Sequence, residues 1–270
     1  MLADKVPEGR FQFINGLAVT VYGEGTPVLM SAGLGGHGAY WQPQLASLSD
    51  YNVILYDHRG TGDSARDLRT PYSVADMADD MVRILDGLEI TAAHVVGHAA
   101  GGVAGLELAR TAPERVLSLT VVNGWAKADR HFKRCFEIRT DIYRAGGAEA
   151  YVKAQPLFLF PAEWISEHLD ELDAQRAQQV AGFQSEDVLM ARIQALSDFD
   201  ISGSLDTIAC PVLVLAALDD MLVPVRCSVQ LDEGLADSQL VALPWGGHAV
   251  NVTVPEDFNS YLNAFLKDVS

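Results

Sequence analysis

The sequence has few cysteines and no long uncharged apolar run. Its three cysteines, Cys135, Cys210 and Cys227, are widely separated and odd in number, which excludes a disulfide framework and a C-x-x-C metal or redox site. We therefore expect a reducing, cytoplasmic setting. No uncharged run approaches the ~18 residues that a membrane span needs, and the opening residues contain no apolar signal region. We expect an untargeted protein that does not enter a membrane.

Basic residues are also scarce. Lys and Arg number 19 against 36 Asp and Glu, which gives a formal charge of −17 and an isoelectric point near 4.6. Phosphate backbones and anionic membrane surfaces are bound mainly through attraction to Lys and Arg. The charge balance therefore argues against nucleic acid and membranes as partners.

The first elements predicted are strands. With 270 residues, 49% of them hydrophobic, the chain can bury roughly three quarters of its unfolded surface. Residues 11–14 and 17–22 flank Asn15 and Gly16, a dipeptide that accepts the positive φ angles of a type I′ turn, so a β-hairpin is predicted. The mostly apolar segments that follow are typical of strands covered on both faces, at residues 27–31, 52–56, 93–96, 117–122, 211–215 and 240–243.

Helical patterns lie between these strands. Apolar residues recur at helical spacing over residues 76–88, and a second helix is predicted over residues 102–109. Alternating strands and helices predict an α/β fold with a mostly parallel sheet. From residue 125 to residue 200 the strand pattern disappears. We therefore expect a single α/β domain over residues 1–270, with a helical cap inserted at residues 125–200.

Residues 96–102, with the sequence VGHAAGG, follow a buried strand and begin a helix. This is the setting of a nucleophile elbow of the form G-x-S-x-G, but Ala99 occupies the position of the nucleophile. Gly97 and Gly101 fit an elbow because its sharp turn leaves no room for their Cβ atoms. The alternative is a tight turn that only packs. The sequence also leaves open whether Ala99 is native or a Ser-to-Ala replacement.

An acid and a histidine follow the elbow. Asp219 and Asp220 lie just beyond the strand at residues 211–215, and His248 follows the last strand segment. Elbow, acid and histidine is the chain order of a hydrolase triad on an α/β sheet. Asp220 is the preferred partner of His248, with Asp219 as its competitor. A lone acid or loop histidine is more often structural, but the ordered set favours a catalytic pair.

The loop at residues 29–38 is glycine-rich and supports two interpretations. In a hydrolase it contributes one backbone N–H to the oxyanion hole, here from Leu34, and the residue after the elbow, Ala100, contributes the second. Because both donors are main-chain groups, an alanine at position 99 need not remove them. The same loop contains the pattern G-x-G-x-x-G, and Asp57 follows at the spacing of a ribose-binding acid. This dinucleotide alternative leaves the hairpin and the acid–histidine pair unexplained.

These residues, together with the cap, resemble the α/β-hydrolase superfamily and, within it, the RutD family of aminoacrylate or carbamate hydrolases of bacterial pyrimidine utilisation. The likeness covers nearly the whole chain, and its more specific segments are residues 122–125 (VNGW), 134–136 (RCF), 154–164 (AQPLFLFPAEW) and 246–253 (GGHAVNVT). Members of this family tend to carry alanine at the elbow. The resemblance implies hydrolysis of a small C–N substrate, either 3-aminoacrylate to 3-oxopropanoate and ammonia or carbamate to ammonia and carbon dioxide. The fold motifs alone do not select a reaction.

Without a serine, an acyl-enzyme cannot form at position 99. We hypothesise that His248, oriented by Asp220, removes a proton from water while the N–H groups of Leu34 and Ala100 stabilise negative charge. The alternative from a different class is a catalytically silent relative that binds a small molecule or a partner. The expected partners are a small-molecule substrate and water. The oligomeric state stays open, with a homodimer as one candidate.

Candidate substrate-binding residues lie in the predicted cap. Arg134 is the hypothesised carboxylate clamp, because it belongs to a basic cluster at the start of the cap that also contains Lys127, Arg130, Lys133 and Arg139. The alternative is a solvated helix face. The aromatic candidates for the pocket wall are Trp125, Phe158 and Trp164. Packing against the sheet would explain these aromatic residues equally well. No metal or cofactor site is predicted, since His94 and His98 lack a shared helical face.

Overall fold

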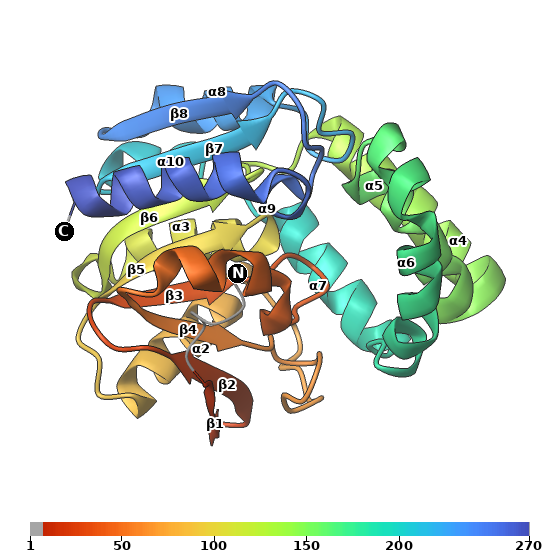
Figure 1. Ribbon diagram of the computed structural model, residues 1–270, viewed down its shortest axis with the longest axis horizontal. Coiled ribbons are helices and arrows are strands. Elements are labelled where there is room, and N and C mark those ends of the chain that lie inside the picture. Colours follow the sequence, from red (N-terminus) through yellow and green to blue (C-terminus); the bar gives the residue numbers. More distant parts are fainter. Residues whose placement is uncertain (1–7, 270) are drawn as a thin grey trace.

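The computed structural model describes residues 8–269 and contains an eight-stranded sheet (Figure 1). The strands lie in the order β1-β2-β4-β3-β5-β6-β7-β8. Strands β1 (Arg10–Ile14) and β2 (Leu17–Tyr22) form an antiparallel hairpin, and β2 also pairs antiparallel with β4. All the other pairs are parallel. The predicted α/β-hydrolase architecture, a mostly parallel sheet opened by an antiparallel hairpin, is confirmed.

The parallel strands agree closely with the apolar segments of the sequence. Their bounds are β3 (Pro27–Ser31), β4 (Asn52–Tyr56), β5 (Ala93–His98), β6 (Val116–Val122), β7 (Val212–Ala217) and β8 (Ser238–Leu243). At the hairpin turn Asn15 and Gly16 have φ angles of 50° and 81°, as a type I′ turn requires. The main difference is in β5, which continues to His98 before the chain turns into a helix.

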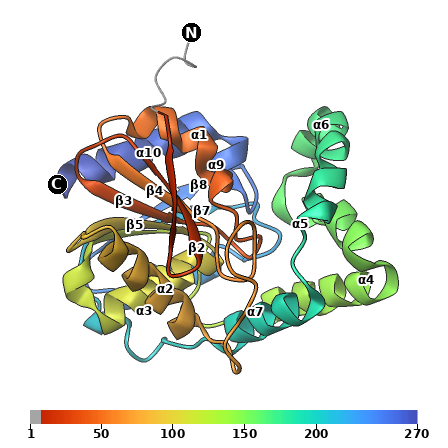
Figure 2. The same cartoon turned by 90° about the horizontal axis from the view of Figure 1, so that it is seen from below.

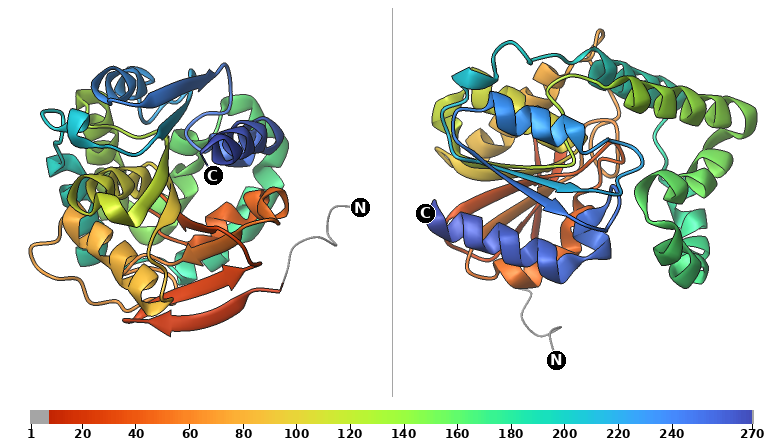
Figure 3. Two further views of the ribbon diagram at one scale, coloured as in Figure 1. Left: turned by 90° about the vertical axis from the view of Figure 1, so that its left-hand side faces the viewer. Right: turned by 90° about the horizontal axis from the view of Figure 1, so that it is seen from above.

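Helices cover both faces of the sheet, which explains why its central strands are apolar. One face packs against α2 (Val74–Gly87), α3 (Ala100–Thr111) and α8 (Arg226–Gly234), and the other against α1 (Gln42–Leu45) and α10 (Pro255–Asp268) (Figure 3). Successive residues of a strand point to opposite faces. Accordingly, Leu29 packs in the core on the side of α2, α3 and α8, whereas Val28 and Met30 pack in the core on the side of α1 and α10.

Four helices separate β6 from β7 in the chain. They are α4 (Arg130–Ala154), α5 (Pro156–Leu159), α6 (Ala162–Ala181) and α7 (Glu186–Asp198). Figures 1 and 2 show them together beyond one end of the sheet, and we refer to residues 130–198 as the cap. After β8, a short helix, α9 (Val250–Thr253), leads into α10. No helix within residues 8–269 is long and apolar enough to cross a bilayer.

Candidate active site

The turn between β5 and α3 has the backbone of a nucleophile elbow. Ala99 joins the strand to the helix with φ 46° and ψ −106°, a region that residues other than glycine rarely adopt. Its N–H donates to the carbonyl of Val122 at 2.8 Å, and its own carbonyl accepts from the N–H of Val103 at 2.9 Å. The turn is therefore held from both sides in a strained conformation.

Two glycines allow the strand and helix to approach each other at this turn. A Cβ atom on Gly97 would lie 2.4 Å from the carbonyl carbon of Gly101, and one on Gly101 would lie 2.2 Å from the carbonyl oxygen of Ser31. Both distances are far inside van der Waals contact. Only glycine fits at either position, as the sequence pattern indicated.

Asp220 and His248 form a buried hydrogen-bonded pair beside this turn. His248 Nδ1 lies 2.8 Å from Asp220 Oδ2, and the two side chains are 3% and 0% exposed. Asp220 Oδ1 accepts the N–H groups of Leu222 at 2.7 Å and Val223 at 2.9 Å. The carboxylate is thus fixed by the backbone and in turn fixes the proton on Nδ1 of the imidazole. His248 Nε2 is left as the atom that can accept a proton from water.

Asp219 has a different set of contacts. Its carboxylate accepts the N–H of Gly246 at 3.3 Å and that of Gly247 at 2.9 Å. These glycines have φ angles of 141° and 66° and lead the chain into His248. Of the two acids that the sequence left in competition, Asp220 contacts the imidazole and Asp219 holds the loop that carries it.

The two residues predicted to donate to an oxyanion lie at one cavity. Leu34 and Ala100 line a cavity together with Ala99 and His248. Neither N–H donates a hydrogen bond to any group within residues 8–269. Unpaired backbone N–H groups of residues that line a cavity are suited to stabilising an anion. The strained turn at Ala99 places Ala100 at the cavity wall.

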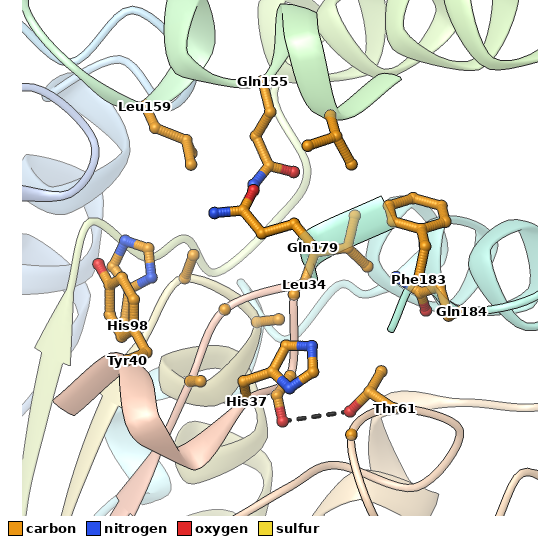
Figure 4. Close-up of a pocket in the computed structure, with 18 of the residues that line it drawn as sticks. Leu34, His37, Tyr40, Thr61, His98, Gln155, Leu159, Gln179, Phe183 and Gln184 are labelled. Carbon is orange, nitrogen blue, oxygen red and sulfur yellow. Dashed lines mark hydrogen bonds between the residues drawn. The ribbon is translucent and has the colours of Figure 1, made fainter. Parts of the chain in front are cut away.

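The loop that carries Leu34 is held by hydrogen bonds to the segment that follows β4. The carbonyl of Gly36 accepts the N–H of His58 at 2.7 Å and the hydroxyl of Thr61 at 3.2 Å (Figure 4). Gly36 has φ 75°, and a Cβ atom there would lie 2.4 Å from Thr61 Oγ1. The loop is consequently rigid, which preorganises the donor of Leu34.

A buried hydrogen-bond network continues beneath this loop. Arg192 on α7 donates from Nη2 to His58 Nδ1 at 2.8 Å, and His58 Nε2 lies 2.9 Å from Ser31 Oγ, which is 2.8 Å from the hydroxyl of Tyr56. Because arginine only donates, His58 must accept at Nδ1 and carry its proton on Nε2. Burial and the adjacent guanidinium hold the pKa of His58 well below its usual value. The network ties the cap to the core through a neutral imidazole.

His98 and Asn123 support the backbone of His248. His98 Nε2 donates to the carbonyl of His248 at 2.8 Å, and Asn123 Nδ2 donates to the same carbonyl at 2.7 Å. Burial and the neighbouring His248 hold the pKa of His98 well below its usual value. The His98 ring also stacks on Tyr40, with centroids 4.9 Å apart. The sequence analysis did not assign these positioning contacts, since they join residues more than a hundred positions apart.

The structure gives no support to the dinucleotide alternative. The G-x-G-x-x-G segment leads into a 3₁₀ turn, Gly38–Trp41, and then into α1, which has four residues. A dinucleotide motif instead requires a long helix whose N-terminus faces the pyrophosphate. The carboxylate of Asp57 accepts the N–H groups of Gly38 at 2.8 Å and Asp63 at 2.9 Å. Asp57 therefore holds two loops together, as expected of a scaffold residue.

Of the aromatic candidates for the pocket wall, only Trp125 lines the cavity. It is 1% exposed, and its ring centroid lies 4.4 Å from that of Phe132. Trp164 stacks between Phe160 and His168 at centroid distances of 4.4 and 4.0 Å. Phe158 is buried under the guanidinium of an arginine on α4. Packing, the alternative explanation, accounts for these last two residues.

The predicted role of Arg134 is corrected by the structure. Its side chain is 73% exposed, pairs with Glu137 at 3.3 Å and does not line the cavity. The arginine that does line it is Arg139, five positions further along α4. At 3.6 residues per turn, five positions rotate a side chain by about 140° around the helix axis. The sequence located the basic cluster but selected the solvent-facing member.

The cavity lies between the carboxyl ends of the strands and the cap. Its volume is about 670 Å³, in the range of small-molecule sites. Figure 4 shows Gln155 and Leu159 pointing into it from the cap, opposite Leu34 and His37 of the core. Within residues 8–269 no group of three or more His, Cys, Asp or Glu side chains is arranged to hold a metal ion.

Comparison with known proteins agrees with this geometry. A family model described as the alpha/beta hydrolase fold matches residues 26–255. A protein of Caulobacter sp. (strain K31), named as a proposed carbamate hydrolase, RutD, is 53% identical over 240 residues, which are 88% of this chain and 90% of the relative. A protein of the same name from Azorhizobium caulinodans is 48% identical over 250 residues, which are 92% of this chain and 94% of the relative.

Solved structures share the fold at lower sequence identity. A hydrolase from Pseudomonas aeruginosa PA01 superposes with a TM-score of 0.85 at 26% identity, covering 96% of this chain and 98% of the other. An enol-lactonase from Burkholderia xenovorans LB400 superposes with a TM-score of 0.84 at 23% identity, covering 96% of this chain and 100% of the other. The second similarity concerns the fold alone.

Proposed function

Because the chain belongs to the α/β-hydrolase family and, within it, to the RutD family, we propose that it hydrolyses a small C–N substrate of pyrimidine degradation, 3-aminoacrylate or carbamate. The relatives support a hydrolase role, and their name favours carbamate. The observation that carries the mechanism is the buried Asp220–His248 pair, which faces the cavity at Ala99 where a hydroxyl is absent. With 3-aminoacrylate, water takes the place of a serine nucleophile.

With 3-aminoacrylate the reaction begins at carbon. His248 first takes a proton from solvent on Nε2 and gives it to C2 of the enamine, and the nitrogen lone pair forms an iminium at C3. Water then adds to C3 while His248 takes one of its protons. His248 returns that proton to nitrogen and takes the hydroxyl proton as the C–N bond breaks. The products are 3-oxopropanoate and ammonia, and the imidazole regains its starting state by returning a proton to solvent.

With carbamate the chemistry is shorter. A proton delivered to nitrogen makes ammonia a leaving group, the C–N bond breaks, and carbon dioxide forms from the carboxylate. The same imidazole supplies that proton and regains one from solvent after the products leave. Neither route needs a covalent intermediate.

The size of the expected acceleration matches labile substrates. A positioned general acid or base contributes ~10² to 10⁴-fold, and hydrolases without their triad retain about 10³ to 10⁴-fold over water. Such factors leave a peptide bond essentially intact. They matter for compounds that already decompose without help.

Ammonia release tests the proposal. 3-Aminoacrylate generated in the cuvette and fresh carbamate are each followed with native protein, heat-denatured protein and buffer. We expect native protein to exceed the spontaneous rate by about 10²-fold or more for one of the two, which also identifies the substrate. Rates equal to buffer for both would reject the proposed function in favour of a silent relative that only binds.

A further inference from the structure

Two arginines are buried in this acidic protein, Arg139 at 5% and Arg192 at 1% exposure. Neither takes part in any of the ion pairs formed within residues 8–269. A buried cation is normally paired with a carboxylate, because removing an unpaired charge from water is costly. Arg192 donates to His58 inside the core, but Arg139 lines the cavity.

The guanidinium of Arg139 is held by aromatic rings. Its central carbon lies 4.9 Å from the ring centroid of Phe136, 4.7 Å from that of Tyr151 and 5.4 Å from that of Phe158. Aromatic rings attract a cation without accepting its N–H groups in conventional hydrogen bonds. The aromatic cage therefore holds the guanidinium in place and leaves its N–H donors available.

Most of these donors are unused. Nη2 donates to Gln155 Oε1 over a long 3.4 Å, and Nε is buried without a partner. No partner for Nη1 occurs in the described part of the chain either. A guanidinium carries five N–H donors in a planar fork. Arg139 thus offers a preorganised and largely unoccupied fork at the cavity wall.

The helix that carries Arg139 contacts the loop of Asp220 through an earlier residue. Cys135, one turn earlier, has its Sγ 4.0 Å from the carbonyl of Met221, the residue after Asp220. Four residues of helix advance about 6 Å along the axis. The backbone of Arg139 therefore lies about one helical turn from Cys135, whose side chain contacts this loop.

A second set of contacts leads to the catalytic histidine. Phe158, which covers the guanidinium of Arg139, precedes Leu159, whose carbonyl accepts the N–H of Ala249 at 3.0 Å. Ala249 directly follows His248. Both connections reach Arg139 from the catalytic end of the cavity.

We propose that Arg139 binds the carboxylate of the substrate and makes the site selective for anions over neutral molecules of the same shape. A carboxylate accepts two parallel N–H bonds from a guanidinium fork and supplies the missing counter-charge. A neutral amide leaves the buried cation unpaired. The identity of the substrate rests on the proposed function, but the receptor itself rests on the contacts of Arg139.

Equilibrium binding of stable substrate analogues tests the receptor. Crotonate replaces the amino group of 3-aminoacrylate by methyl, and crotonamide is its neutral counterpart; acetate and acetamide stand in the same relation to carbamate. Isothermal titration of wild-type protein is expected to give at least about tenfold tighter binding of one anion than of its amide. The variant Arg139→Gln is expected to lose that preference.

Two further variants control the measurement. Arg134→Gln removes an exposed charge from the same helix and is expected to keep the wild-type preference. Arg139→Lys keeps the charge but not the fork, and it is expected to bind the anion about threefold or more weakly than wild type. Should Arg139→Gln fail to fold, the lysine variant decides. Wild-type anion affinity in Arg139→Lys, or an unchanged preference in folded Arg139→Gln, would overturn the proposal.

The binding assay needs no turnover, so the two proposals fail separately. Anion-selective binding that depends on Arg139, without ammonia release, would reject the proposed function and support the receptor. Ammonia release without anion selectivity would support the function and reject the receptor.

Discussion

At the scale of single residues, position 99 separates two properties that a nucleophile elbow usually combines. The backbone keeps the strained angles of φ 46° and ψ −106°, but the side chain is a methyl group. The neighbouring components are intact, since His248 is held by Asp220 and the N–H of Ala100 has no partner within residues 8–269. The site therefore lacks only the hydroxyl of an ordinary serine hydrolase.

Restoring this hydroxyl should restore covalent catalysis. We expect Ala99→Ser to hydrolyse an activated ester with a burst of leaving group, because His248 is available to take the serine proton and two N–H groups face the resulting oxyanion. Stopped-flow absorbance measures the burst, and intact mass detects the acyl adduct. Adding His248→Ala to the same protein should abolish both signals. A folded Ala99→Ser protein with neither burst nor adduct would contradict the geometry described for the elbow.

Relieving the backbone strain at position 99 should raise the free energy of unfolding. A residue in such a conformation costs of order 1–3 kcal/mol, whereas glycine adopts it freely but adds about 0.4–1 kcal/mol of unfolded-state entropy. We expect Ala99→Gly to raise the free energy of unfolding by about 1 kcal/mol in urea titrations. The matched change Ala104→Gly, within α3, should lower it by about 1 kcal/mol or more. Destabilisation by both variants would show that the turn is not strained.

At the scale of elements, the helices that frame the site are defined by their ends as well as by their apolar faces. Ser73 is the N-cap residue of α2: its hydroxyl accepts the N–H of Asp76, while the Asp76 side chain accepts the N–H of Ser73. This capping box satisfies two donors that the first turn leaves unpaired. Its buried face then packs on the sheet through Met77, Met81 and Ile84.

Removing the N-cap hydroxyl of α2 should destabilise the protein. We expect Ser73→Ala to lower the free energy of unfolding by about 1 kcal/mol, measured by urea titration with circular dichroism. Ser166→Ala provides the control, because Ser166 is exposed within α6 and its hydroxyl bonds only the carbonyl of Ala162. There, alanine should be neutral or slightly stabilising. An equal decrease in the free energy of unfolding of the two variants would show that the effect does not come from capping.

The strands and the elbow were predictable from sequence because their signals are local. Buried strands are continuous apolar runs, and the bounds predicted for β3 and β4 are those of the structure. Asn15 and Gly16 specify a turn by their own backbone preferences. Gly97 and Gly101 identify the elbow because the approach of strand and helix excludes every other residue.

The cap side of the site was not predictable in the same way. Arg134 and Arg139 occur in one basic cluster, and only the rotation of α4 against the core decides which of them faces the cavity. Asn123 and His98 reach the carbonyl of His248 through contacts made by the folded chain. Such contacts depend on how elements pack, and no short pattern in the sequence encodes them.

At the scale of the whole molecule, buried histidines should determine the response to mild acid. Burial holds the pKa values of His58 and His98 well below the usual 6.5. Below that pH the unfolded chain takes up protons that the native state does not bind. Native stability is therefore lost as the pH falls through about 6.5. Asp200, whose pKa is lowered to about 2 chiefly by its hydrogen bond from Lys127, adds a loss in the same direction only at lower pH.

Urea titrations between pH 7.5 and 5.5 test this dependence. Each of the two histidines can remove up to about 1.4 kcal/mol per pH unit below 6.5, so the free energy of unfolding should fall by up to about 3 kcal/mol at pH 5.5. The formal charge of −17 opposes this trend, because acid relieves its repulsion. Measurement in 0.5 M NaCl, where the screening length is about 4 Å, suppresses that contribution. Constant or rising stability on acidification would show that the two imidazoles are not held neutral.

The central claim is that an imidazole held by a carboxylate moves the protons of the reaction beside an alanine. The most direct test is kcat/KM for ammonia release by wild-type protein and by His248→Ala, with Ala99 unchanged in both and with His168→Ala, on the cap outside the cavity, as the control. The account predicts a loss of ~10² to 10⁴-fold for His248→Ala and none for His168→Ala. A folded His248→Ala protein that releases ammonia as fast as wild type would contradict it.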